Sequence, residues 1–307
     1  MTTNAFEGIK TAKVNGTTLA YREQGEGEPV VFLHGGMMDL RVWKEQLPAV
    51  GRSYRAIAYS RRFARPNEPI DPEAIDPVLQ HVEDLVAFLN EMDAKPAHLV
   101  GHSGGGLVCL YTALRHPDVV RSLVLEEPAA LTLFSPTIPP RLTDLLQLIA
   151  TRPRTAIALI GFMFRTMIPL KKALERGEDE KALWIFVRGA MGKKSFEQIS
   201  KETRAQLSEN RNELRTLMLH PDPNIPPMGH EAVRRMPMPV LLVTGERSPA
   251  FILRITDRLE ELLPIVERVE IPEASHLMHV ENAAAVNEAI IGFLGRRRDR
   301  PTSLPSR

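Results

Sequence analysis

Short apolar runs rich in β-branched residues recur along this chain, and most are followed by a segment with helical spacing. The runs that predict strands cover residues 17–22, 29–33, 55–59, 97–101, 122–125, 240–243 and 266–271. Apolar residues three and four positions apart predict helices over residues 78–92, 104–115, 250–263 and 283–294. This alternation favours an α/β fold, with a mostly parallel sheet flanked by helices on both faces.

The alternation stops between residues 130 and 235. This stretch shows helical patterns rich in Leu, Met, Arg and Lys, interrupted by prolines, and no convincing strand pattern. A helical segment inserted into such an array predicts a cap over the carboxyl edge of the sheet, where ligands bind in open α/β folds. We therefore predict a core of residues 1–129 and 236–296, an inserted all-helical cap of residues 130–235, and a flexible tail of residues 297–307.

Composition and charge mainly exclude classes of protein. The chain has 307 residues and a formal net charge of +1, which gives no reason to expect nucleic acid or an anionic membrane as a partner. The lone Cys109 excludes an internal disulfide, and neither a signal peptide nor a membrane-spanning run is visible. We expect a cytoplasmic protein without a membrane partner; the sequence leaves its oligomeric state open.

Residues 101–105 read Gly-His-Ser-Gly-Gly, which is the G-x-S-x-G pattern between a predicted strand and a predicted helix. A sharp turn there strains Ser103 and exposes its hydroxyl, while the flanking glycines avoid collisions with neighbouring backbone. The helix that follows offers free N–H groups and a positive dipole end to a developing oxyanion. Ser103 is therefore the predicted nucleophile.

A serine hydroxyl needs a base that a third group holds in place. The loop after the last predicted strand, residues 273–279, reads Glu-Ala-Ser-His-Leu-Met-His. His276 is the predicted base, and His279 is its rival. We expect no metal on this pair of histidines because no third ligand lies nearby in the sequence. No cofactor is expected either, because residues 101–106 lack the glycine spacing of a dinucleotide-binding turn.

The oxyanion hole needs two N–H donors. One is expected from Gly104, the residue after the nucleophile. The other is expected from the loop after the strand of residues 29–33, where Gly36 and Met37 are the candidates. His34 in the same loop reads as a structural hydrogen-bonding residue.

In this order, the motifs resemble the α/β-hydrolase superfamily. The resemblance rests on residues 34–36, 59–62, 101–105, 240–249 and 274–276. It implies the α/β-hydrolase fold and a place among the small-molecule hydrolases with a helical cap. That group includes esterases, C–C bond hydrolases and cofactor-free haloperoxidase-like enzymes.

The chain departs from the family pattern at the acid of the triad. Family members usually carry Asp in a Gly-x-x-Asp turn after the strand of residues 239–243, but Ser248 stands at that position here. Two carboxylates, Glu126 and Glu127, instead follow the strand beside the predicted elbow, and charged residues leaving a buried strand need a partner. We assign the acid to Glu127; Glu126, Glu246 and the absence of any acid remain open.

These residues together predict a Ser-His-Glu hydrolase of small carboxylic esters or lactones, acting through an acyl-enzyme. The expected substrate is apolar and carries an ester or a similar carbonyl. C–C bond hydrolysis and cofactor-free perhydrolysis remain alternatives within the same fold. The alternative from another class is a non-catalytic, ligand-binding protein with this fold.

Overall fold

A computed structural model of the chain describes residues 8–71, 73–135, 141–222 and 224–298. Eight strands form one sheet in the order β1-β2-β4-β3-β5-β6-β7-β8. The antiparallel pairs are β1–β2 and β2–β4, and all the other neighbours are parallel. The strands are β1 (Lys10–Val14), β2 (Thr17–Gln24), β3 (Pro29–Leu33), β4 (Arg55–Tyr59), β5 (Ala97–His102), β6 (Val120–Glu126), β7 (Val240–Gly245) and β8 (Val266–Ile271).

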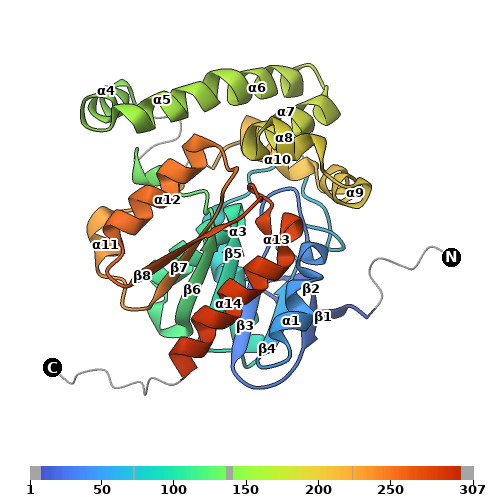
Figure 1. Ribbon diagram of the computed structural model, residues 1–307. Helices are drawn as coiled ribbons and strands as arrows, with labels where there is room; N and C mark the ends of the chain where they lie inside the picture. Colours follow the sequence, from blue (N-terminus) through green and yellow to red (C-terminus); the bar gives the residue numbers. More distant parts are fainter. Residues whose placement is uncertain (1–7, 72, 136–140, 223, 299–307) are drawn as a thin grey trace.

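Helices cover both faces of this sheet (Figure 1). Those of the core are α1 (Gln46–Val50), α2 (Val78–Glu91), α3 (Ser103–Arg115), α12 (Ala250–Leu262), α13 (Met278–Glu281) and α14 (Ala283–Arg298). Three short 3-10 turns accompany them: η1 (Leu40–Trp43), η2 (Pro117–Val119) and η3 (Leu131–Leu133).

Alternation along the central strands fills two separate apolar layers. In β3, Val31 and Leu33 pack into the layer that contains α2, α3 and α12, while Val30 and Phe32 pack into the layer that contains α1 and α14. Because successive strand residues point to opposite faces, a continuous apolar run is what a doubly covered strand requires. The mostly parallel sheet with helices on both faces confirms the predicted fold class.

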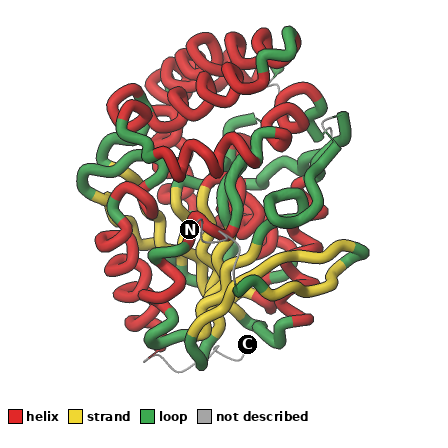
Figure 2. The backbone as a smooth tube through the Cα atoms, turned by 90° about the vertical axis from the view of Figure 1, so that its right-hand side faces the viewer, coloured by secondary structure: helices red, strands yellow, loops and turns green. Residues whose placement is uncertain are grey.

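The described chain between β6 and β7 is helical, apart from turns and loops. It contains α4 (Leu142–Thr151), α5 (Pro153–Phe162), a π-helical turn η4 (Met163–Met167), α6 (Ile168–Glu175), α7 (Asp179–Met191), α8 (Lys193–Glu197), α9 (Lys201–Glu209), α10 (Asn212–Leu219) and α11 (His230–Arg234). Figures 1 and 2 show most of these helices gathered above one end of the strands. A helical insert at this place fits the predicted cap.

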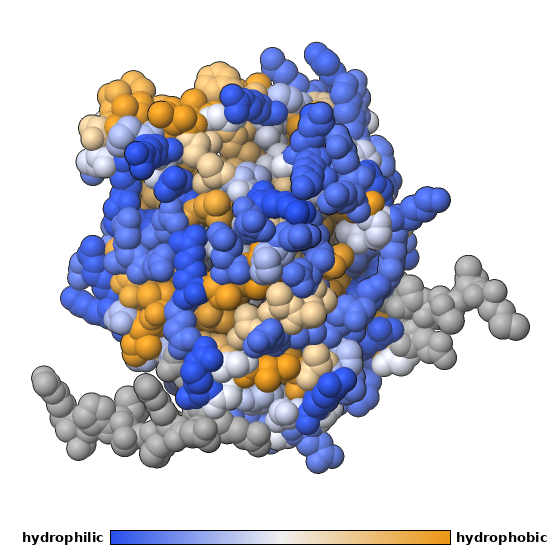
Figure 3. Space-filling model, viewed as in Figure 1, coloured by the Kyte–Doolittle hydropathy of each residue, from blue (hydrophilic) through white to orange (hydrophobic). Residues whose placement is uncertain are grey.

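Aromatic packing is one of the contacts between the cap and the core, and the outer helices of the cap expose apolar side chains to solvent. Phe162 of α5 stacks on Phe251 of α12 with ring centroids 3.6 Å apart. On the outer surface, Leu142 and Ile157 are each 71% exposed. Figure 3 shows apolar residues gathered over α4 and α5.

Among the strands and α-helices of the described core, three were not predicted from the pattern. The strand β1 is short and half exposed, and α1 and α13 span only five and four residues, too few for a helical period to show. The predicted tail begins at residue 297, but α14 continues to Arg298, and residues 299–307 lie outside the described chain. Within the described residues, none of the helices has the length and apolar character needed to cross a bilayer.

Candidate active site

The turn from β5 into α3 places Ser103 in a conformation that few side-chain-bearing residues adopt. Its φ is +50°, in the left-handed region, and α3 begins at this residue. A Cβ on Gly105 would lie 2.4 Å from the carbonyl oxygen of Leu33, and one on Gly101 would lie 2.7 Å from Sγ of Cys109. The glycines of the motif are therefore required by close packing, and the strained turn is the one that the sequence predicts.

His276 and Glu127 are joined by a short hydrogen bond. Nδ1 of His276 lies 2.7 Å from Oε2 of Glu127, and both side chains are buried. Because a carboxylate accepts hydrogen bonds, Nδ1 carries the proton and Nε2 is left as the basic nitrogen. Glu127 itself has φ +44°, which turns the chain at the end of β6. The structure thus brings together the base and the acid that the sequence favours.

The turn after β7, which usually carries the triad acid in this family, donates a backbone hydrogen bond to Glu127. The backbone N–H of Gly245 donates to Oε1 of Glu127 at 2.9 Å. Ser248, at the usual Asp position, is buried, and its hydroxyl has no hydrogen-bond partner among the residues that the structure describes. Glu246 accepts from the backbone N–H of Glu273 at 2.6 Å, so its carboxylate holds the histidine loop rather than an imidazole.

The two remaining candidates, Glu126 and His279, pair with each other. Nδ1 of His279 lies 2.6 Å from Oε2 of Glu126, and both side chains have zero exposure. The ring of His279 packs against Trp43 in a tilted arrangement, with centroids 4.6 Å apart and an interplanar angle of 37°. This second pair is therefore closed off from solvent in the core.

His102, the residue before the nucleophile, connects the elbow to the base. Its Nε2 lies 2.8 Å from the carbonyl oxygen of His276, and its ring centroid is 4.6 Å from those of His276 and His279. Burial, together with the neighbouring imidazoles, holds the pKa of His102 well below its usual value. A neutral ring with Nε2–H donating to the carbonyl follows, and His276 is thereby held against the elbow.

The loop after β3 lies directly on the elbow. A Cβ on Gly35 would meet the ring of His102 at 2.5 Å and Cβ of Ser103 at 3.3 Å. A Cβ on Gly104 would lie 3.6 Å from the backbone nitrogen of Gly36. The N–H groups of Gly36 and Gly104 therefore belong to neighbouring backbone segments beside the nucleophile.

Met37, the other predicted donor, has its N–H engaged. It donates to Oε2 of Glu213 at 2.7 Å, and Met37 has φ +55°. Glu213 comes from the cap helix α10 and also accepts from Arg61 Nη2 at 2.5 Å. Sequence reasoning missed Glu213, because a glutamate amid a charged helix gives no signal of where the helix packs.

Two other residues singled out by the sequence have structural roles, His34 in the same loop and Cys109 in α3. Nε2 of His34 accepts from the backbone N–H of Arg61 at 2.9 Å, and Nδ1 donates to the carbonyl of Gly35 at 2.8 Å. Burial holds the pKa of His34 well below its usual value, which favours this neutral form. Cys109 is buried beneath the elbow, and burial raises its thiol pKa.

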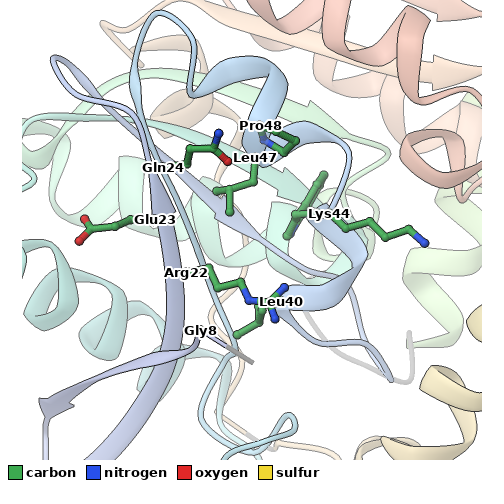
Figure 4. A pocket seen from close by; sticks show the side chains of 9 residues that line it. Gly8, Arg22, Glu23, Gln24, Leu40, Lys44, Leu47 and Pro48 are labelled. Atoms are coloured by element: carbon green, nitrogen blue, oxygen red, sulfur yellow. The ribbon is translucent and has the colours of Figure 1, made fainter. Parts of the chain in front are cut away.

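A separate cavity of about 280 Å³ lies beside η1 (Figure 4). It is lined by Arg22, Leu40, Lys44 and Leu47, among others, and includes none of the candidate catalytic residues. We assign no role to it. Within the described ranges, no group of three or more His, Cys, Asp or Glu side chains is arranged to hold a metal ion.

Comparison with known proteins points to one family. The sequence profile of the alpha/beta hydrolase family matches residues 30–289. The 2-hydroxy-6-oxo-6-(2'-aminophenyl)hexa-2,4-dienoic acid hydrolase of Metapseudomonas resinovorans is 26% identical over 294 residues, covering 92% of this chain and 90% of that protein. The non-heme chloroperoxidase CPO-A1 of Kitasatospora aureofaciens is 35% identical over 114 residues, but this match spans only 36% of the chain and 40% of that protein.

Solved structures agree on the fold. The carboxylesterase CesB (YbfK) of Bacillus subtilis superposes with a TM-score of 0.67 at 17% identity, covering 93% of this chain and 90% of that one. Identity at this level carries information about the fold alone.

Proposed function

Because the chain belongs to the alpha/beta hydrolase family, we propose that it is a serine hydrolase of small carboxylic esters or lactones that works through an acyl-enzyme. The observation that carries the proposal is the 2.7 Å contact between Nδ1 of His276 and Oε2 of Glu127. It fixes the imidazole in the tautomer that a serine nucleophile needs. The strained φ of Ser103 supports the same reading, because such strain is kept where a hydroxyl must be presented.

In the first half of the reaction, Oγ of Ser103 attacks the acyl carbonyl. Nε2 of His276 takes the hydroxyl proton and then gives it to the leaving alkoxide as the bond between carbonyl carbon and alkoxy oxygen breaks. Glu127 keeps the ring in place and offsets the positive charge on the imidazolium. In the second half, Nε2 of His276 takes a proton from water as the water oxygen attacks the acyl carbon. The bond between the acyl carbon and Oγ of Ser103 then breaks, His276 returns the proton to Oγ, and the carboxylic acid leaves.

We assign the oxyanion hole to the N–H groups of Gly104 and Gly36. The proximity of these two backbone segments and the free first turn of α3 support the assignment. Each such donor contributes about 10²- to 10³-fold to turnover in enzymes of this kind. Met37 is the weaker candidate because its N–H already has Glu213 as acceptor.

The charges beside the site favour a neutral substrate. Arg61 is buried and ion-paired with Glu213, so it offers no free charge to a substrate carboxylate. An apolar ester or lactone fits such surroundings better than a dianion. The described helices of the predicted cap lie above one end of the strands, and we expect them to bound the substrate.

C–C bond hydrolysis is the second candidate, favoured by the length of the match to the hexadienoic acid hydrolase. Turnover of aryl esters, acyl lactones and a 2-hydroxy-6-oxo-dienoate by the same preparation separates the two activities. The ester assignment requires the highest kcat/KM on an ester or lactone. A clear preference for the dienoate, abolished in Ser103→Ala, overturns it.

Cofactor-free perhydrolysis uses the same acyl-enzyme, with hydrogen peroxide in place of water. Adding hydrogen peroxide to an ester assay shows how the acyl group divides between water, which gives the carboxylic acid, and peroxide, which gives the peracid. For the non-catalytic alternative, the decisive result is a chain that neither turns over any carbonyl substrate nor reacts with a fluorophosphonate.

A further inference from the structure

The cap is bonded directly to the backbone of the loop that carries an oxyanion donor. Oε2 of Glu213, on α10, accepts the N–H of Met37, and Oε1 accepts from Arg61. Oε1 also lies 3.7 Å from where a Cβ on Gly36 would be. The exposed fraction of the Glu213 side chain is 16%, so its contacts are largely shielded from water.

Arg61 links Glu213 to the peptide bond between Gly35 and Gly36. Its guanidinium donates to the carbonyl oxygens of His34 and Gly35, both at 3.2 Å. The carbonyl of Gly35 and the N–H of Gly36 belong to one planar trans peptide, so they point in opposite directions. Holding that carbonyl toward Arg61 therefore turns the Gly36 N–H the other way, and the backbone of Gly104 lies close to that nitrogen.

The loop needs such support because its own sequence does not fix its shape. Gly35 and Gly36 give it a flexible backbone, and Met37 has a positive φ, which is unfavourable for a residue with a side chain. A second cap contact lies just beyond. Asp39, which has zero exposure, accepts from Asn210 at 2.8 Å and from Gln206 at 2.9 Å, both on the α9 side of the cap.

We propose that Glu213 is a positioning residue through which the cap sets the orientation of the Gly36 N–H, so that the oxyanion hole is complete only when α10 is seated on the loop. The inference rests on the proposed function, since it assigns a role within that same site. It makes the cap a part of the catalytic apparatus as well as a cover, because withdrawing α10 releases both Met37 and Arg61.

The test compares three variants of the full chain with wild type, using a soluble p-nitrophenyl ester. Glu213→Ala removes both bonds, and Glu213→Gln keeps an amide oxygen for one of the two donors. Glu202→Gln is the matched control, because Glu202 also forms an ion pair from the cap to the core, with Lys44 at 2.8 Å, but does not touch the loop. The readouts are kcat, KM, the rate of labelling by a fluorophosphonate, and Tm.

We expect kcat and the labelling rate of Glu213→Ala to fall together by about 10- to 100-fold, less than the loss of a whole oxyanion donor. KM should stay within about 2-fold of wild type, because a positioning defect acts mainly on the transition state. Glu213→Gln should recover part of the loss, and Glu202→Gln should match wild type. If Glu213→Ala does not fold, the test is the comparison of Glu213→Gln with wild type and Glu202→Gln.

Three results overturn the proposal. One is an unchanged kcat per folded molecule in both Glu213 variants, with only Tm lowered. Another is a higher kcat, which would mean that the carboxylate blocks the site. The third is an equal loss in Glu202→Gln. A wild-type chain that is neither labelled nor active contradicts the proposed function itself, and is thus distinguishable from a failure of this inference.

Discussion

Nδ1 of His279 lies 2.6 Å from Oε2 of Glu126, immediately beside the corresponding contact between His276 and Glu127. Two consecutive carboxylates at the end of β6 thus hold two histidines of one loop, each carboxylate holding one. The two pairs differ in burial. Glu126 and His279 have zero exposure, whereas the His276 side chain keeps 10%. We infer that the sealed pair anchors the loop and leaves the other pair free for chemistry.

The first prediction concerns the stability of this anchor. Either Glu126→Met or His279→Leu alone should lower the free energy of unfolding by about 3–5 kcal/mol, because each leaves its partner buried and unpaired. The double variant should be more stable than the sum of the two losses implies, since it removes the pair together. Urea unfolding of the four proteins measures this coupling. Strict additivity would contradict a direct interaction.

The acid of the triad can be identified by comparing two glutamates. Glu127→Gln should lower kcat by about 10³- to 10⁴-fold, because the imidazole loses the group that fixes its tautomer. Glu246→Gln should change kcat by less than about 3-fold, in line with the range for surface contacts, because the carboxylate of Glu246 accepts from the backbone N–H of Glu273 and does not hold the imidazole of His276. Steady-state kinetics on one ester suffices. Equal, mild losses in the two variants would remove Glu127 from the mechanism.

The packing of the elbow predicts opposite effects of Gly→Ala at two positions. In Gly105→Ala the new methyl group would lie 2.4 Å from the carbonyl oxygen of Leu33 and 2.5 Å from that of His34, so the elbow must distort. We expect at least about 2 kcal/mol of destabilisation, together with loss of activity. Gly161→Ala meets nothing within 4 Å near the end of α5 and should stabilise by up to about 1 kcal/mol. Thermal unfolding compares the two; matched losses would contradict the close packing.

Acid sensitivity should follow from a buried histidine between two central strands. Nδ1 of His98 lies 2.7 Å from Oγ of Ser122, and burial lowers the pKa of His98 to about 4, against an opposing effect of Glu28. Between pH 6.5 and 4 the unfolded chain therefore binds more protons than the folded chain. The free energy of unfolding should fall by about 3 kcal/mol through this window on account of His98 alone.

His98→Gln should flatten that dependence, and His116→Gln, at a partly exposed position, is the control. Urea midpoints at a series of pH values give the comparison. The assignment fails if wild type and His98→Gln lose stability in parallel.

Most of the fold could be predicted from local patterns in the sequence. The run of residues 29–33 is fully apolar because both faces of that strand are covered, and residues 97–101 are apolar apart from His98 and Gly101. The turn at Ser103 is recognisable from glycines that close packing requires. The sequence favoured Glu127 as the acid because charges that end a buried strand need partners, but it left Glu126, Glu246 and the absence of any acid open.

The features of the site that could not be predicted from the sequence depend on contacts between distant segments. Which of two adjacent carboxylates meets which of two histidines is decided by the turn of the backbone at Glu127, whose φ is +44°. Glu213 lies 152 positions from Arg61 and 176 from Met37. A helical pattern predicts which face of α10 packs inward, but it does not predict which loop that face contacts.

The central claim is that Ser103 is a nucleophile activated by His276 and Glu127. Mass spectrometry of the intact chain after treatment with a fluorophosphonate, followed by peptide mapping, tests it most directly. We predict one adduct per chain on the peptide that contains Ser103, none in Ser103→Ala, and labelling slowed by several orders of magnitude in His276→Ala while the fold persists. An adduct on another residue, or labelling that survives unchanged in Ser103→Ala, would contradict the account.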